Sequence, residues 1–339
     1  MKILFIGGTG LISSACSALA VERGHELTIL NRARSSKYSP PEGARLLAAD
    51  FHDDEAAVNS LLAPFRFEAV VDWIAYTPED IERDIRLFTG KTDQFVFISS
   101  ASAYQKPPDH YLITEETPLS NPFWQYSRDK IAIEQRLMEA YRQRGFPATI
   151  IRPSLTYGPS QIPLCMGSWQ HPYTVIDRMR HGQKIIVPGD GASLWTLTWN
   201  EDFAVGLVGL LGREDAVGEA FHITSDEVLT WNQIYQEAGH AAGVHPDIIH
   251  IPSDLIAAYD PEALGSLTGD KVNSTVFDNR KIRRFVPEFQ PKVTWAQGVR
   301  KALAWFEADP ARQTIDEPAN QLWDQIIAAY RRAWPVESK

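Results

Sequence analysis

The first 155 residues of the chain alternate between short apolar runs and longer amphipathic stretches. The apolar runs predict strands at 2–6, 27–30, 46–49, 69–74, 95–98 and 149–151. The intervening stretches predict helices at 11–23, 54–62, 78–88 and 123–144. Because these strands are apolar on both faces and alternate with helices, the pattern indicates an α/β fold with a parallel sheet covered on both sides.

The alternation ends near residue 155. Prolines and glycines cluster at 158–163 and 188–191. The segments beyond 155 predict helices near 172–181, 200–211 and 230–242, short strands at 184–187 and 220–223, and amphipathic helices at 295–308 and 318–334. We therefore predict two domains, 1–155 and 156–339, the second a smaller mixed α/β lobe of which some elements return to the first.

Composition narrows the functional classes. The net charge of the 339 residues is −10 and the pI about 5.4, so phosphate backbones repel the chain and nucleic acid is an unfavourable main partner. The two cysteines and nine histidines show no metal-ligand spacing, so no metal is expected. No run reaches membrane-spanning length and the first apolar run is too short for a signal peptide, so a cytoplasmic location is expected.

A glycine-rich turn, Gly7-Gly8-Thr9-Gly10-Leu11-Ile12-Ser13, joins the first strand to the first helix. In that position glycines allow close approach of a diphosphate, and the helix N-terminus offers free N–H groups. The turn predicts a Rossmann-type, doubly wound dinucleotide-binding sheet. Its expected cofactor contacts are Gly7, Thr9, Gly10, Leu11 and Ile12.

The residues after the second and third strands bear on the choice of cofactor. Asn31 and Arg32, with Arg34 and Lys37 nearby, stand where an acid often binds the adenosine ribose. A basic fork suits a 2′-phosphate, which favours NADP(H) over NAD(H); a solvated basic loop is the alternative. Asp50 and Phe51, after the third strand, are candidates for contact with the adenine.

Tyr126 and Lys130 lie four residues apart and share one face of the predicted helix at 123–144. A neighbouring ammonium favours phenolate, so Lys130 is predicted to lower the pKa of Tyr126 and make it a proton donor and acceptor near neutral pH. The spacing alone is common on helix surfaces, and the glycine turn in the same chain is what favours the catalytic interpretation.

Together these residues resemble the extended short-chain dehydrogenase/reductase superfamily, in its NAD-dependent epimerase/dehydratase branch. The resemblance spans nearly the whole chain, through the glycine turn, Tyr126 and Lys130, and the segments 97–104, 152–159, 189–191, 200–204 and 277–281. It implies that Ser100 is the catalytic serine (Ser102 if the register differs), Tyr126 the general acid/base and Lys130 a ligand of the nicotinamide ribose. Further cofactor contacts implied by it are Ile74, Ala75, Tyr76, Ser99, Pro153, Ser154 and Leu155.

Three departures from the family pattern affect the expected substrate. Ala101 and Ser102 stand where the sugar-nucleotide 4,6-dehydratases have an Asp-Glu pair, which disfavours water elimination. Ser154 replaces an asparagine of many epimerases, and no arginine follows the turn at 189–191 to hold a diphosphate. The substrate pocket is therefore expected to be apolar or aromatic. Its candidate lining residues, for which a core position is equally open, are Trp124, Met166, Trp169, Trp195 and Trp199.

The sequence thus predicts an NAD(P)-dependent oxidoreductase or epimerase that acts on a hydroxyl or keto group of a sugar-like small molecule. A nucleotide-sugar epimerase with retained NAD is an alternative. By analogy with the superfamily we expect a homodimer. A resemblance to chloroplast stem-loop RNA-binding proteins, in the Gly7–Gly10 turn and Asn31-Arg32, leaves a second class open, an RNA-binding protein on the same fold. The acidic charge and the retained Ser100, Tyr126 and Lys130 weigh against it.

Overall fold

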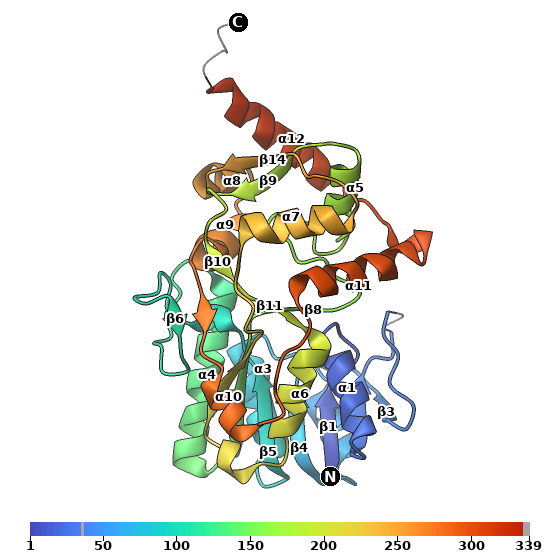
Figure 1. The fold of residues 1–339 in the computed structure, drawn as a ribbon. Helices are drawn as coiled ribbons and strands as arrows, with labels where there is room; N and C mark the ends of the chain where they lie inside the picture. Colours follow the sequence, from blue (N-terminus) through green and yellow to red (C-terminus); the bar gives the residue numbers. More distant parts are fainter. Residues whose placement is uncertain (35–36, 335–339) are drawn as a thin grey trace, which may run out of the picture.

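Seven parallel strands form one sheet in the lower body of the molecule, which the computed structural model describes for residues 1–34 and 37–334 (Figure 1). Their spatial order is β12-β7-β5-β4-β1-β2-β3. The strands are β1 (Lys2–Ile6), β2 (Glu26–Asn31), β3 (Arg45–Ala48), β4 (Phe67–Asp72), β5 (Thr92–Ile98), β7 (Ala148–Pro153) and β12 (Ala220–Ile223). The reversal of strand order between β1 and β4 is that of a doubly wound Rossmann-type sheet, and the predicted fold class is confirmed.

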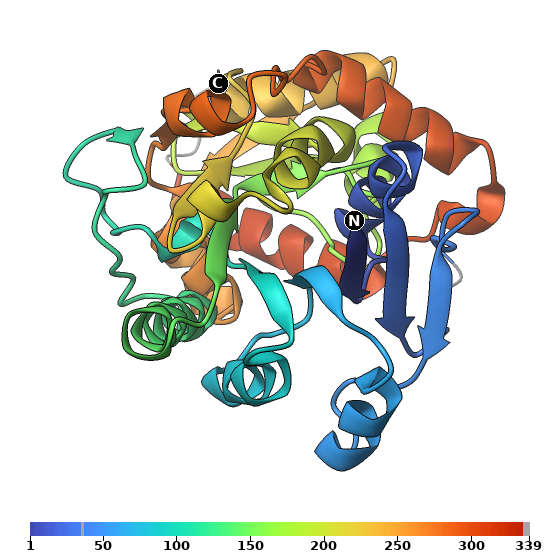
Figure 2. The same ribbon diagram turned by 90° about the horizontal axis from the view of Figure 1, so that it is seen from below.

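Helices cover both faces of this sheet, as Figure 2 shows from below. One face carries α2 (Glu55–Leu62), α3 (Pro78–Phe88) and α4 (Gln125–Arg144); the other carries α1 (Ser13–Glu22), α6 (Asn200–Leu210) and α10 (Arg280–Phe285). Neighbouring residues of β1 serve the two cores alternately: Ile3 and Phe5 face α1 and α6, whereas Leu4 and Ile6 face α2 and α3. This is the physical reason that the strand is apolar from Ile3 to Ile6.

Local sequence signals set the ends of the helices that border the site. At the start of α3, Thr77 and Asp80 form a reciprocal capping box, with Pro78 in the first turn. The long helix α4 ends at Gly145, whose φ of +66° is a left-handed conformation suited to glycine. Both boundaries lie within two residues of the sequence prediction.

Two elements from beyond residue 155 lie with the main sheet, as the expectation that some elements return to the first domain allows. Strand β12 pairs in parallel with β7 (Ala220 opposite Ile150), and α6 packs against α1. A strand of four residues is too short for its sequence pattern to indicate which distant strand it pairs with. Strand β4 ends at Asp72, two residues early, because the Asp72 carboxylate accepts hydrogen bonds from the N–H groups of Ile74 and Ala75 and turns the chain.

The upper lobe is built from short strand pairs and helices. Its pairs are β8 (Leu155–Tyr157) with β11 (Leu197–Trp199), β9 (Ile185–Pro188) with β14 (Ile248–Ile251), β10 (Leu194–Trp195) with β13 (Leu229–Thr230), and β6 (Leu112–Ile113) with β15 (Val276–Phe277). The helices are α5 (Thr174–Arg180), α7 (Trp231–Ala241), α8 (Ser253–Tyr259), α9 (Ala263–Ser266), α11 (Trp295–Glu307) and α12 (Glu317–Arg332). The chain also forms short helical turns: η1 (Ala101–Ala103) and η2 (Glu214–Ala216) adjoin the main sheet, and η3 (Leu267–Lys271) and η4 (Pro310–Arg312) lie further along the chain.

Aromatic packing holds this lobe together. Tyr157 makes edge contacts at 5.2 Å with both Trp199 and Trp295. Gly298 lies so close to Tyr157 that a Cβ at that position would stand 1.8 Å from the phenolic oxygen, so α11 can dock only through a glycine. Across the described segments, none of the helices combines the length and the apolar character required to span a bilayer.

Candidate functional site

The glycine turn has the backbone that a diphosphate site requires. Gly7 and Gly8 adopt φ of +105° and +89°, which side chains other than glycine disfavour. A Cβ on Gly8 would lie 3.1 Å from Ile29. The Ser14 N–H donates to the Gly10 carbonyl oxygen at 3.0 Å, and at the start of α1 the described residues provide no side-chain cap, so the helix N-terminus can face an anion. Ser13, in place of the last glycine, accepts a hydrogen bond from the Gly10 N–H at 2.8 Å.

A cavity of about 570 Å³ opens beside this turn and runs along the carboxyl ends of the strands. The sequence-predicted residues that line it are Gly7, Thr9, Gly10, Leu11, Ile12, Asn31, Arg32, Asp50, Phe51, Ile74, Tyr76, Ser99, Tyr126, Lys130 and Pro153. Three predicted contacts do not line it: the side chain of Ala75 is buried, and Ser154 and Leu155 face a second cavity. The first cavity therefore brings the glycine turn and the Tyr126–Lys130 face together.

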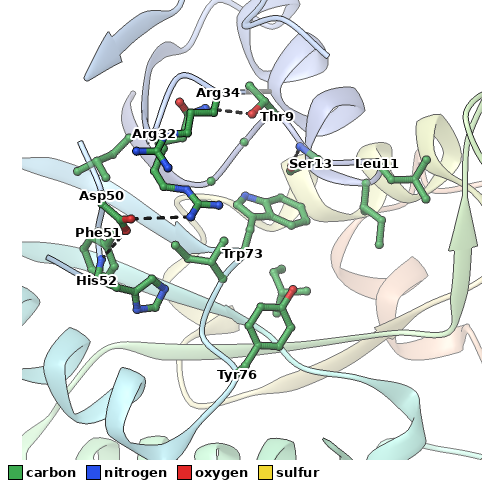
Figure 3. Close-up of a pocket in the computed structure, with 18 of the residues that line it drawn as sticks. Thr9, Leu11, Ser13, Arg32, Arg34, Asp50, Phe51, His52, Trp73 and Tyr76 are labelled. Atoms are coloured by element: carbon green, nitrogen blue, oxygen red, sulfur yellow. Dashed lines mark hydrogen bonds and ion pairs between the residues drawn. The ribbon is translucent and has the colours of Figure 1, made fainter. Parts of the chain in front are cut away.

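Basic residues occupy one end of the first cavity (Figure 3). Asn31 donates a hydrogen bond to Thr9 at 3.0 Å, which ties the end of β2 to the glycine turn. Arg32 and Arg34 line the cavity, and Arg32 lies 3.8 Å from the Asp50 carboxylate across an exposed gap. An exposed ion pair with an N–O distance of 3.8 Å contributes little, so the Arg32 guanidinium is available to a phosphate.

Trp73 was missed as a site residue because the sequence pattern placed it inside a strand. The strand ends at Asp72, and Trp73 lines the first cavity with its ring 5.6 Å from that of Phe5. In Figure 3 it lies between the arginine end of the cavity and Tyr76. His52, Ile98 and Thr156 line the cavity as well, without a local signal that could have identified them, and Trp169, predicted for the substrate pocket, lines this cavity too.

Lys130 is buried on α4 and its ammonium is held by backbone. Its Nζ donates hydrogen bonds to the carbonyl oxygens of Ala75 at 2.7 Å and Ile98 at 2.9 Å. Burial lowers the pKa of Lys130 to about 8, while the charge of Asp72 opposes that shift. The ammonium is therefore charged at neutral pH and lines the first cavity.

Tyr126 departs from the expected electrostatics. Its pKa is raised to about 12, chiefly by burial, and a hydrogen bond with Ser100 opposes the rise only in part. Lys130 Nζ lies 5.7 Å from the centre of the Tyr126 ring, with its hydrogen bonds directed to carbonyls. The prediction that Lys130 lowers the pKa of Tyr126 is wrong in the structure without cofactor. Burial of the phenol raises its pKa, and the Lys130 ammonium, which is hydrogen-bonded to two backbone carbonyls, does not offset that rise.

A chain of hydroxyl groups continues from Tyr126. The Oγ atoms of Ser100 and Ser102 lie 2.9 Å apart, and Ser127 donates a hydrogen bond to Ser102 Oγ at 2.7 Å. Ser102 also donates its backbone N–H to Ser100 Oγ, which fixes that hydroxyl at the end of β5. Both candidate serines thus belong to one network, and Ser100 is the one that contacts Tyr126.

Ser100 and Ser102 line the second cavity, which has a volume of about 470 Å³. Tyr126, Pro153 and Trp169 line both cavities and form the wall between them. Of the five predicted aromatic and apolar lining residues, Trp124, Trp169 and Trp195 face the second cavity. Met166 and Trp199 do not, because both are buried in the core of the upper lobe.

Buried ionic groups support both cavities from behind. Arg152 and Glu134 form an ion pair with an N–O distance of 2.6 Å and side chains only 6% and 2% exposed, and Ser99 donates a hydrogen bond to Glu134. Asp72 and Asp84 are buried side by side. Burial and the negative charge of Asp72 raise the pKa of Asp84 well above its ordinary value, which favours the protonated form of this carboxyl.

Comparison with known proteins identifies similar sequences and folds. The sequence profile of the NAD-dependent epimerase/dehydratase family matches residues 3–224. The 2′-dehydrokanamycin reductase of Streptomyces kanamyceticus is 25% identical over 300 residues, covering 86% of this chain and 81% of that protein. The chloroplast stem-loop binding protein of 41 kDa b from Arabidopsis thaliana is 28% identical over 262 residues, covering 74% of this chain and 65% of that protein. A solved epimerase from Methanothermobacter thermautotrophicus shares the fold, with a TM-score of 0.74 at 18% identity and coverage of 91% of this chain and 93% of that one.

Proposed function

This chain belongs to the NAD-dependent epimerase/dehydratase family and is an enzyme of the extended short-chain dehydrogenase/reductase type, and on that premise we propose that it is an NAD(P)-dependent oxidoreductase acting on a hydroxyl or keto group of a sugar or sugar derivative. The first cavity takes the cofactor and the second the substrate. Tyr126 serves as the general acid/base, Ser100 orients the substrate oxygen and Lys130 binds the cofactor ribose.

The junction between the cavities carries this proposal. Tyr126 and Pro153 form a wall common to both, so a molecule in either cavity reaches the same tyrosine. Ser100 contacts Tyr126 from the second cavity, and Lys130 adjoins it in the first. A proton donor between a dinucleotide-sized cavity and a smaller one is the arrangement that transfer of hydride to a carbonyl carbon requires.

The residues of the first cavity fit a nicotinamide dinucleotide. The glycine backbone at Gly7 and Gly8 and the uncapped N-terminus of α1 would hold the diphosphate. The third hydrogen of the Lys130 ammonium remains for a ribose hydroxyl, since the other two are donated to carbonyl oxygens. The chemistry supplied by such a cofactor is hydride transfer at its nicotinamide ring.

The protonation state of Tyr126 favours reduction. With a pKa of about 12 the phenol keeps its proton at neutral pH and can donate it to a carbonyl oxygen of the substrate. Oxidation of an alcohol would need the phenolate, which the raised pKa of Tyr126 disfavours at neutral pH. The name of the reductase relative supports the same direction on a keto sugar derivative.

We extend the proposal to a preference for NADP(H). Arg32 and Arg34 line the cavity where β2 ends, and the residue at that end is Asn31, which has no charge to repel a 2′-phosphate. The competing acid is Asp50, 3.8 Å from Arg32. Parallel fluorescence titrations with NADPH and NADH test this, and tighter binding of NADH would contradict it.

An epimerase that retains NAD is the runner-up. It would oxidise and re-reduce one substrate, so its cofactor would stay bound through purification. Mass spectrometry of nucleotides released from the purified protein separates the two: tightly bound NAD(H) favours the epimerase, whereas exchangeable NADPH favours the reductase.

The similarity to a stem-loop binding protein keeps RNA binding as a second class. The net charge of −10 opposes it. RNA binding predicts salt-sensitive retardation of a structured RNA in a gel, and no retardation at low salt would exclude it. The homodimer and the cytoplasmic location remain predictions; light scattering of the purified protein measures the first.

Tyr126→Phe tests the catalytic assignment. The variant should lose about 10²- to 10⁴-fold in turnover while NADPH binding persists, because only the proton donor is removed. Tyr111→Phe, at an exposed position outside both cavities, is the matched control and should retain wild-type rates. Wild-type turnover in Tyr126→Phe would refute the proposed mechanism.

A further inference from the structure

The second cavity is largely apolar and aromatic, and its charges are few and concentrated. Among the described residues that line it, the charged ones are Lys106, Asp270 and Lys271. Two ammonium groups and one carboxylate leave one net positive charge in a chain whose total charge is −10. A local excess of positive charge in an apolar cavity of an acidic protein points to the ligand rather than to general solubility.

Lys106 is almost completely buried, with 1% of its side chain exposed. Its Nζ lies 3.3 Å from an Asp270 carboxylate oxygen and 5.9 Å from the centre of the Trp195 ring. Over the part of the chain that the structure describes, no hydrogen-bond acceptor for this ammonium accompanies that ion pair. An ammonium has three hydrogens to donate, so Lys106 keeps donor capacity for a ligand in the cavity.

A second donor without a partner lies in the same wall. The indole nitrogen Nε1 of Trp195 is buried, and within residues 1–34 and 37–334 no group accepts its hydrogen. Trp195 lines the second cavity and its ring stacks on Trp231 at 5.4 Å, which holds the indole in place. Buried N–H donors are normally satisfied, so this wall of the cavity is polar at a point that neighbouring atoms cover.

The third element of this site is a helical turn that the sequence pattern did not predict. Turn η3 carries both Asp270 and Lys271 and has π-helical geometry, which often occurs at functional sites. Asn121 donates hydrogen bonds to the carbonyl oxygens of Gly269 at 2.7 Å and Ser102 at 2.8 Å. The charged turn is thereby fixed to the serine loop next to Tyr126.

Glycines allow η3 to approach so closely. A Cβ on Gly265 would stand 2.4 Å from the Trp124 ring, and one on Gly269 would stand 3.0 Å from the Asn121 amide oxygen. Lys271 Nζ in turn lies 5.9 Å from the centre of the Trp124 ring. The packing therefore sets Asp270 and Lys271 over the cavity as a rigid unit.

We propose that the substrate carries a carboxylate, which binds between Lys106 and Lys271 in the second cavity. This rests on the proposed function only in taking the second cavity as the substrate site. One net positive charge matches a monoanion, and Asp270 repels the second charge of a phosphate ester. The substrate class is thus a keto or hydroxy sugar acid.

The proposed carboxylate-binding site also affects the proton donor Tyr126. The negative charge of Asp270 is already among the causes that raise the pKa of Tyr126. A bound carboxylate adds a second negative charge on the same side and keeps Tyr126 in the phenol form that donates a proton. Recognition of the acid and reduction of its keto group therefore support one another.

Calorimetric titration of the cofactor-free protein tests the site directly. The probes are D-glucuronate, D-galacturonate and D-gluconate, each beside its neutral amide, with glucose 6-phosphate as a dianion. At least one acid should bind at least tenfold more tightly than its amide. Equal affinity of acids and amides, binding by none of the acids, or tighter binding of the phosphate ester would each overturn the proposal.

Two substitutions should change the affinity for the acid in opposite directions. Lys106→Met should weaken the bound acid about tenfold or more and leave its amide unchanged, whereas Asp270→Asn should tighten the acid because it removes the competing carboxylate. The double variant Lys106→Met/Asp270→Asn leaves no unpaired buried charge, so loss of acid preference there cannot reflect unfolding. Lys184→Met, in a surface pair with Asp247 at 2.8 Å, is the matched control.

Failure of this proposal is distinguishable from failure of the proposed function. Acid binding is measured without cofactor, and NADPH affinity is measured separately on the same variants. Wild-type NADPH affinity with no acid preference refutes the carboxylate site alone. Absent NADPH and NADH binding refutes the proposed function, whatever the sugar acids do.

Discussion

Replacing Lys130 by methionine tests the contact on which cofactor binding depends. Lys130 Nζ donates to the carbonyl oxygens of Ala75 at 2.7 Å and Ile98 at 2.9 Å. Two of the three ammonium hydrogens are thus committed to backbone, and one remains for the cavity that Lys130 lines. Methionine keeps the length and the apolar stem of the side chain and removes every donor.

The size of the effect follows from one lost charged hydrogen bond. Such a bond contributes about 1.5–3 kcal/mol, which corresponds to about a 10- to 150-fold rise in the Kd of NADPH. The two carbonyl groups left without a donor cost about 1–3 kcal/mol each in the free energy of unfolding. Binding is therefore measured only after circular dichroism and a melting curve confirm that the variant is folded.

The assay is a fluorescence titration of NADPH into wild type, Lys130→Met and Tyr126→Phe. Because Tyr126→Phe removes the proton donor and keeps the ammonium, its Kd should stay near the wild-type value. The pKa of Lys130 is about 8, so the ammonium is charged below that pH and wild-type affinity should fall as pH rises through 8. Lys130→Met should lack this fall in NADPH affinity between neutral and alkaline pH. Wild-type affinity in Lys130→Met, or an unchanged pH step, would refute the reasoning.

Three further predictions concern specificity and stability. Arg32→Ala should weaken NADPH about tenfold and leave NADH unchanged in parallel titrations; an equal loss for both cofactors would contradict a 2′-phosphate site. Glu134→Gln should lower the free energy of unfolding by about 3–5 kcal/mol in urea, because it leaves Arg152 buried without its carboxylate, whereas the pair Glu134→Leu/Arg152→Met should recover most of that loss. The pKa of Asp84 is raised in the folded protein, so its contribution to folding stability is present below about pH 4 and is lost as the pH rises above that value, by at most about 1.4 kcal/mol per pH unit. Asp84→Asn should remove that slope and be more stable than wild type at pH 8; a pH dependence identical to wild type would show that Asp84 is ionised.

Most of the first cavity could be identified from local sequence. The glycine turn, Asn31 and Arg32 follow consecutive strands of a parallel sheet, and carboxyl ends of such strands meet at one edge. Trp73 was the exception, because two hydrogen bonds to the Asp72 carboxylate end the strand earlier than its apolar run suggests. Side-chain capping of this kind depends on geometry that periodicity does not report.

The second cavity was much less accessible to sequence reasoning. The motifs pointed to Ser100 and to aromatic walls, and the structure bears out Trp124, Trp169 and Trp195 as lining residues. Lys106 and Asp270, which are distant in sequence, had no pattern that linked them. Turn η3 lies in a region for which no helix was predicted, since Gly265 of α9 and Gly269 of η3 disfavour helix on propensity and are required by their contact with Trp124.

The sequence by itself determined the doubly wound sheet, the glycine turn and the helical face shared by Tyr126 and Lys130. These features depend on periodicity and on steric rules that act within a few residues. Only the tertiary structure decided that β12 joins the main sheet, that Lys106 meets Asp270, and that the pKa of Tyr126 is raised. Strand pairing, ion pairing and desolvation depend on which distant groups come together and how much water they exclude, and those quantities exist only once the chain has folded.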